Sequence, residues 1–204
     1  LVGSEMCIRD RGGHPKILEK MLSTNMEQLT GYSTDHYCDS ARERIRQACG
    51  CPDADVHFLV GGTQTNLTAI ASILRPYQGV LAAHDGHIAC HETGAIEATG
   101  HKVLPIPCVD GKITADQVRE FCHSHQTNTM REHMVQPGMV YISFPTEIGS
   151  LYTKKELKEL SAACHENGIP LYIDGARMGY GLTSPDADVT LQDIASLCDM
   201  FYIG

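Results

Sequence analysis

Short apolar runs alternate with longer amphipathic segments along most of the chain. The apolar runs are three to five residues long and lie at 56–60, 80–83, 102–105, 140–144, 171–173 and 200–203. Runs this short predict buried strands rather than helices. Segments with a helical period separate them, at 65–74, 88–99, around 118–121, 153–168 and from Thr190 onward. The alternation predicts an α/β fold with three α/β/α layers, in which helices cover both faces of a mostly parallel sheet.

Local signals mark several boundaries of these segments. Two amphipathic helices are predicted before the first strand, at residues 14–28 and near 38–49. Thr153 and Glu156 have the spacing of a capping box, which predicts a helix start. Residues 123–138 are polar and without a period, so we expect a long surface loop there.

Residues 1–11 do not share the patterning of the rest of the chain. They resemble a translated sequencing adapter or a cloning scar, and a disordered natural terminus is the alternative. We expect residues 12–50 to form an N-terminal helical segment and residues 51–204 to form one large domain that is incomplete.

Composition narrows the class of protein. The 204 residues have a net charge of −9, which disfavours nucleic acid and anionic membrane surfaces as partners. No apolar run approaches the roughly 18 residues that a membrane-spanning helix needs. The nine cysteines are mostly scattered singly, Cys90, Cys122, Cys164 and Cys198 among them, which is typical of free buried thiols. We therefore expect a cytoplasmic protein.

A glycine-rich turn between a predicted strand and a predicted helix is a candidate anion site. Gly61 and Gly62 let the backbone approach a phosphate, Thr63 and Thr65 offer hydroxyls, and the helix N-terminus offers free N–H groups. The sequence matches neither the Walker A nor the dinucleotide fingerprint. A turn that only caps the helix is the alternative interpretation.

Histidines cluster just after the strand at 80–83. His84, His87, Cys90 and His91 could supply zinc ligands, but their spacing matches no standard zinc pattern, so we expect no metal. The functional interpretation is that His87 lies flat over a planar cofactor. Capping and surface histidines are the alternative.

An acid and a cation follow the predicted strand at 171–173. A carboxylate there, Asp174, would lie outside the carboxyl end of the strand, where α/β folds bind ligands. One established task of such a carboxylate is to keep a proton on the pyridine nitrogen of pyridoxal 5′-phosphate (PLP). The alternative is a structural ion pair between Asp174 and Arg177.

Taken together, these segments resemble the threonine aldolase and aromatic amino acid β-eliminating lyase family, PLP enzymes with the fold of aspartate aminotransferase. The resemblance covers about 13–204 and rests on HPKILEKML, GGTQTN, GHIACHETGAIEATGHKV, MVYISFPTEIGSLY, IDGARMGYG and FYIG. It implies a homodimer or homotetramer that acts on an amino acid substrate.

The resemblance also implies roles for individual residues. Gly62 and Thr63 match the phosphate-binding turn, and His87 matches a ring-stacking histidine that serves in acid–base chemistry. Asp174 matches the partner of the pyridine nitrogen, and Arg177 the arginine beside the cofactor's phenolic oxygen. Two further positions lie in matching segments and are weaker candidates, namely Glu92 and Thr146.

The implied reaction of the parent protein is retro-aldol cleavage of L-threonine and related β-hydroxy amino acids to glycine and an aldehyde. In the family, the lysine that binds PLP follows the segment matching FYIG, and a small C-terminal domain comes later. We therefore expect the chain to be an inactive N-terminal fragment. Two alternatives stay open, β-elimination from an aromatic or sulfur amino acid and a catalytically dead subunit that acts by dimerisation. The genomic reading frame beyond Gly204 would separate a true truncation from an incomplete sequence.

Overall fold

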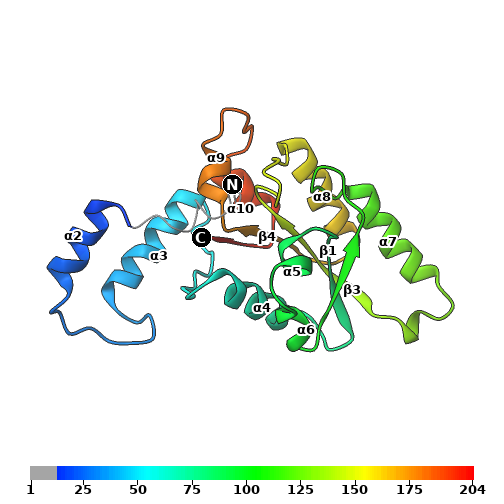
Figure 1. Ribbon diagram of the computed structural model, residues 1–204, viewed down its shortest axis with the longest axis horizontal. Helices are drawn as coiled ribbons and strands as arrows, with labels where there is room; N and C mark the ends of the chain where they lie inside the picture. The colour runs from blue at the N-terminus through cyan, green and yellow to red at the C-terminus, as the bar shows by residue number, and fades with distance from the viewer. Residues whose placement is uncertain (1–12) are drawn as a thin grey trace. The chain divides into compact units, whose positions relative to one another are not determined.

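The computed structural model describes residues 13–204 (Figure 1). The predicted adapter or scar at 1–11 lies outside the described residues. The chain divides into two compact units, Leu1–Ala41 and Arg42–Gly204, and the division falls within helix α3 (His36–Cys49). The organisation into 12–50 and 51–204 stays a prediction. No helix within the described part of the chain is long and apolar enough to cross a membrane.

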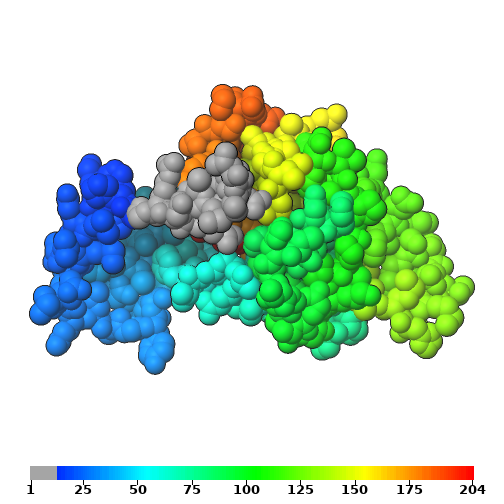
Figure 2. Space-filling model, in the orientation of Figure 1, coloured from blue at the N-terminus to red at the C-terminus, as the bar shows by residue number. Residues whose placement is uncertain are grey.

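The first unit is built around helix α2 (Pro15–Thr24), which is four residues shorter at its C-terminus than the sequence predicts. The hydroxyls of Ser23 and Thr24 donate to the carbonyl of Lys20 at 2.8 and 3.0 Å. Such local bonds compete with continuation of the helix. α2 has no buried residue, and it lies at the surface, in blue, in Figure 2. Helix α3 follows and matches the helix predicted near 38–49.

Five parallel strands form the sheet of the second unit, in the order β2-β1-β3-β4-β5. Their bounds are β1 Gln78–Ala83, β2 Lys102–Ile106, β3 Gln136–Ser143, β4 Leu171–Gly175 and β5 Met200–Ile203. Ser143 pairs with Asp174, which pairs with Tyr202. Because the strands are parallel, the segments that follow them emerge at one edge, where the candidate residues were predicted.

Helices cover both faces of this sheet, as predicted (Figure 1). Val80 and Ala82 of β1 point into the core shared with α4 (Gly62–Ile73), α5 (His87–Cys90) and α6 (Ala95–Ala98). Leu81 and Ala83 point into the opposite core. The helices on that side are α7 (Ala115–Thr127), α8 (Lys154–Glu166), α9 (Met178–Leu182) and α10 (Leu191–Leu197). The three-layer α/β/α fold is therefore confirmed.

Capping boxes start three of these helices. The predicted one is present, with Glu156 N donating to Thr153 Oγ1 at 3.2 Å and Thr153 N donating to Glu156 Oε2 at 2.7 Å. Thr114 and Thr190 start α7 and α10 in the same way. Each box satisfies backbone N–H groups that the helix itself leaves free.

The strand predicted at 56–60 is wrong. The segment is an irregular connection without a strand neighbour, and Phe58, Leu59 and Val60 are exposed. Side chains hold its backbone in place of a ladder, because Arg42 Nε donates to the carbonyl of Val56 and Gln64 Oε1 accepts from Val60 N. An apolar run predicts burial, but it does not ensure a partner strand.

Two further predictions need correction. The helix expected at 88–99 is two short helices, α5 and α6, because Thr93 and Gly94 adopt positive φ values of 49° and 75° between them. The loop expected at 123–138 is mostly ordered, since α7 runs to Thr127, a 3₁₀ turn spans Arg131–His133 and β3 begins at Gln136.

Gly175 offers a direct test of the pairing of β4 with β5. A Cβ there would collide with the backbone carbonyl of Tyr202 and lie 2.6 Å from Met178 Cε. We expect Gly175→Ala to lower the free energy of unfolding by about 3 kcal/mol, because a backbone atom cannot move aside without separating the strands. Gly179→Ala is the control, since no atom of the described residues lies within 4 Å of its Cβ position in α9. Equal urea midpoints for the two variants would contradict this packing.

Candidate functional site

Asp174 lies at the C-terminal edge of the sheet as the penultimate residue of β4, and it is 3% exposed. Its Oδ2 accepts hydrogen bonds from Asn66 Nδ2 at 3.0 Å and from the Tyr141 hydroxyl at 2.5 Å. Its Oδ1 accepts from the backbone N–H of Ala176 at 3.0 Å. Three donors therefore converge on this buried side chain, which is the environment that a carboxylate requires.

Asn66, on α4, joins two buried acids. Its Nδ2 donates to Glu92 Oε1 at 2.8 Å as well as to Asp174, and its Oδ1 accepts from the Tyr172 hydroxyl at 2.8 Å. The side chain is completely buried. Both amide protons and the amide oxygen are therefore used, which fixes the orientation of the group.

Glu92 lies between α5 and α6, at the break in the predicted helix. Burial raises the pKa of its carboxyl, and the hydrogen bond from Asn66 opposes that shift. Its Oε1 is 3.7 Å from His87 Nε2, whereas its Oε2 is buried and has no hydrogen-bond partner among residues 13–204. Leaving a buried oxygen without a hydrogen bond costs free energy, so a polar group of a bound ligand that donated to it would be stabilising.

His87 and Arg177 meet at Glu147, which follows β3. His87 Nδ1 is 3.4 Å from Glu147 Oε2, and Arg177 Nη2 donates to Glu147 Oε1 at 2.8 Å. The hydrogen bond with Glu147 raises the pKa of His87, and burial offsets this in part. Burial alone would raise the pKa of Glu147, but His87 and Arg177 together lower it to about 2. Among the ion pairs within residues 13–204, Arg177 thus pairs with Glu147 and not with Asp174.

These shifts predict a pH window for the stability that Glu147 contributes. Its lowered pKa gives stability that is present above pH 4.5 and lost as pH falls towards about 2. The raised pKa of His87 gives stability that is full below pH 6.5 and lost as pH rises through the raised value. Between about pH 4.5 and pH 6.5 we expect Glu147→Gln to lower the free energy of unfolding by about 2–3 kcal/mol. The loss should be smaller at lower and at higher pH.

Urea unfolding across pH checks this window. On the alkaline side the loss of stability should be partial, because Arg177 stays charged. Glu159→Gln is the control, because Glu159 is an exposed residue of α8 that is 3.8 Å from Lys155. Its effect on the free energy of unfolding should be small and should depend little on pH. If the difference in free energy of unfolding between the wild type and Glu147→Gln did not depend on pH, the ionic contacts of Glu147 with His87 and Arg177 would be contradicted.

The N-terminus of α4 lies close to these groups. Gly61 precedes the helix without a side-chain cap, and Thr63 is exposed in the first turn. A Cβ on Gly62 would lie 3.0 Å from the Tyr202 hydroxyl. Burial raises the pKa of Tyr202, and the nearby charge of Asp174 adds to this. The free N–H groups and the helix dipole make this turn suited to an anion.

Thr146 and the side chains weighed as zinc ligands remain to be placed. Thr146 Oγ1 is 2.7 Å from Ser150 Oγ in a tight turn, so its hydroxyl is engaged there. The four side chains weighed as zinc ligands do not form one group. His84 groups instead with Asp85 and Cys108, and Cys90 is exposed rather than buried as expected. The eight cysteines of the described chain are all free, and Cys122 and Cys164 are buried as expected.

Sequence reasoning missed several residues of this site. Glu147 had a signal, since it is an acid shortly after a predicted strand, as Asp174 is. Asn66 also had one, a polar residue within the predicted helix at 65–74. Tyr141 and Tyr172 lie in apolar strands, where nothing in the sequence distinguishes a functional hydroxyl from a core ring.

Two comparisons link the chain to threonine aldolases. A low specificity L-threonine aldolase of Pseudomonas sp. (strain NCIMB 10558) is 32% identical over 165 residues, which are 80% of this chain and 46% of that protein. A Leishmania major threonine aldolase structure is 51% identical with a TM-score of 0.92, covering 97% of this chain and 56% of that one. The chain spans about half the length of the curated relatives it matches.

A more distant solved structure has the same fold, and one family model matches most of the chain. The aromatic aminotransferase of Pyrococcus horikoshii OT3 has a TM-score of 0.68 at 15% identity, covering 92% of this chain and 49% of that one. The family model described as "Beta-eliminating lyase" matches residues 10–204. The chain therefore belongs to the β-eliminating lyase family.

Proposed function

We propose that the protein containing this chain is a PLP-dependent carbon–carbon lyase. Its reaction is retro-aldol cleavage of L-threonine and related β-hydroxy amino acids to glycine and an aldehyde. The observation that carries the proposal is Asp174, a buried carboxylate held by three donors next to the N-terminus of α4. The similarity to threonine aldolases supports this substrate class.

The residues present fit PLP. Asp174 Oδ1 accepts one hydrogen bond, which leaves it a lone pair for the N–H of a protonated pyridine. The α4 turn at Gly62 and Thr63 would bind the phosphate, His87 would stack on the ring, and Arg177 would face the phenolic oxygen. The bound cofactor supplies an electron-withdrawing ring that stabilises negative charge at the substrate's α-carbon.

The side chains of this chain would position groups and move a proton. Asp174 would hold a proton on the ring nitrogen, and Asn66 and Tyr141 orient its carboxylate. Glu147 contacts His87 at Nδ1, and Nε2, which is 3.7 Å from Glu92 Oε1, would accept the proton of the substrate's β-hydroxyl. A carboxylate on Nδ1 makes the imidazole a stronger base, in agreement with the raised pKa of His87.

β-Elimination from an aromatic or sulfur amino acid is the second candidate. The description of the matched family model favours it. The same Asp174, His87 and Arg177 would serve either reaction, so the products must separate the two.

We also propose a homodimer or homotetramer in the cytoplasm. The family resemblance implies the assembly. Helix α2 supports it, because Ile17, Leu18, Met21 and Leu22 are each at least half exposed on one short helix. The cysteines of the described residues are all free, which supports a reducing compartment. Light scattering coupled to size exclusion would measure the assembly, and a monomer at micromolar concentration would contradict it.

Product analysis of the whole protein with PLP tests the reaction. We expect glycine and acetaldehyde from L-threonine in equal amounts, with the aldehyde followed by a coupled alcohol dehydrogenase. Pyruvate and ammonia from cysteine, without glycine from threonine, would instead support β-elimination. If the protein binds PLP but yields neither set of products, both proposals are contradicted.

A further inference from the structure

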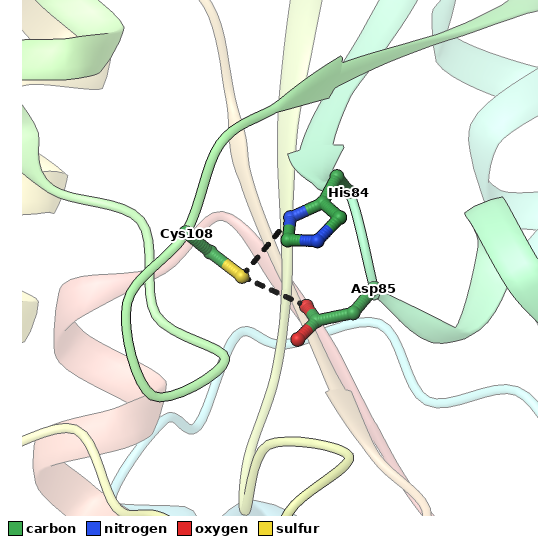
Figure 3. A group of neighbouring side chains, drawn as sticks. All are labelled: His84, Asp85 and Cys108. Atoms are coloured by element: carbon green, nitrogen blue, oxygen red, sulfur yellow. Dashed lines mark hydrogen bonds between the residues drawn. The ribbon is translucent and has the colours of Figure 1, made fainter.

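A separate polar cluster lies beyond the ends of β1 and β2 (Figure 3). His84 and Asp85 directly follow β1, and Cys108 is two residues beyond β2. Cys108 Sγ is 3.3 Å from His84 Nδ1 and donates to Asp85 Oδ1 at 3.0 Å. The three ligand atoms lie within 4.8 Å of one another. Figure 3 shows the side chains converging from two loops.

From the sequence we expected no metal, but on this geometry we propose that His84, Asp85 and Cys108 form a Zn²⁺ site. In tetrahedral coordination, with Zn–S near 2.3 Å and Zn–N or Zn–O near 2.0–2.1 Å, neighbouring ligand atoms are about 3.5 Å apart. The contacts of Cys108 at 3.0 and 3.3 Å are therefore a few tenths of an ångström shorter than the site requires. Small rotations of the side chains would open the group around a metal ion.

The chemistry of the three groups selects this metal. A thiolate, an imidazole and a carboxylate together suit Zn²⁺, whereas Mg²⁺ and Ca²⁺ prefer oxygen ligands alone. The contacts that Cys108 makes now use a thiol, which is a weak donor, so their loss would cost little. His84 is exposed, which gives the ion a path from solvent and leaves a fourth position for water or another ligand.

Both supporting loops are tied to the sheet. His84 N donates to the carbonyl of Ile106 at 2.9 Å, which joins the end of β1 to the end of β2. Val109 and Lys112 exchange backbone hydrogen bonds just after Cys108 and close that turn. Ligands on short, fastened turns lose little conformational freedom when a metal binds, which favours affinity.

The cluster also borders the candidate active site. Asp85 and Gly86 line a cavity of about 10 Å³ together with Tyr141 and Glu147. Asp85 is two residues before His87 in the chain. An ion that binds Asp85 would therefore be held two residues from His87.

Co²⁺ substitution tests the site in the whole protein without PLP, which removes the cofactor's own absorbance. We expect one Co²⁺ per chain with a thiolate-to-cobalt charge-transfer band in the near ultraviolet, displaced by Zn²⁺. Cys108→Ser should abolish the band and weaken Zn²⁺ binding at least about 10-fold, measured against a chromogenic chelator. Cys51→Ser, a half-buried thiol outside the cluster, is the matched control and should leave both unchanged.

His84→Ala provides a second test in case Cys108→Ser misfolds. The His84 side chain is exposed, so its removal should not disturb the fold. It should weaken Zn²⁺ binding to a similar degree and keep the circular dichroism of the wild type. A cobalt band that survives Cys108→Ser, or binding that neither variant weakens, would overturn the proposal. The test reads metal binding alone, so its failure is distinct from failure of the proposed lyase activity.

Discussion

Replacing Asp174 by asparagine in the whole protein is expected to lower the turnover of L-threonine by on the order of 100-fold or more. The side chain keeps its size, but its charge is lost, so a proton on the ring nitrogen of PLP is no longer favoured. An amide cannot accept hydrogen bonds at both terminal atoms, so one of the donors from Asn66, Tyr141 or Ala176 would also lose its acceptor. Turnover should therefore fall more than the Michaelis constant rises.

Two measurements separate this role from a structural one. PLP should still bind to the Asp174→Asn protein, as followed by its visible absorbance after gel filtration. Asp186→Asn makes the same chemical change at an exposed loop position and should retain normal turnover. Near-normal turnover of Asp174→Asn would rule out the proposed role of this carboxylate.

The second large effect is expected from Asn66→Leu. Leucine has a similar size but no polar atoms, so Glu92 Oε1 and Asp174 Oδ2 would each lose a donor, and the Tyr172 hydroxyl would lose its acceptor. All of these atoms belong to buried residues. We expect the free energy of unfolding to fall by about 3–5 kcal/mol, the cost of removing one donor from each of two buried acids and the acceptor of a buried hydroxyl.

The same substitution elsewhere in the chain provides the control. Asn167→Leu removes one hydrogen bond, from Nδ2 to the carbonyl of Ala163 at the end of α8, and should cost about 1 kcal/mol. Adding Glu92→Gln to Asn66→Leu should recover part of the stability, because it neutralises one of the two acids. If the urea midpoints of Asn66→Leu and Asn167→Leu coincide, Asn66 does not connect the two acids.

The sequence predicted those parts of the fold that have local causes. Capping at Thr153 and the apolar run at 171–173 depend on neighbours within a few residues, so the start of α8 and the position of β4 were predicted well. The placement of Asp174 at the sheet edge followed from the parallel arrangement. The strand prediction at 56–60 was wrong because a strand needs a neighbouring strand to pair with, and no local pattern in the sequence reveals one.

The contacts within the site are a different matter. Asn66 and Asp174 are 108 positions apart, and Arg177 reaches Glu147 across 30. From the sequence, a structural ion pair between Asp174 and Arg177 was the alternative to the role beside the cofactor that the family resemblance implies for Arg177. In the fold the guanidinium pairs instead with Glu147, which follows a different strand.

The strand order has a consequence for where new chemistry can arise. From β1 the chain moves to β2 over one face of the sheet, and from β2 onward it moves the other way, to β3, β4 and β5, over the opposite face. The connections that leave β1 and β3 therefore diverge, and α/β sheets of this winding open a crevice at such a topological switch point. His87 and Glu147 follow these two strands. We therefore expect substitutions at exposed positions of the two diverging loops to alter the site, whereas substitutions of their buried residues, Ile88 and Phe144 among them, also lower stability.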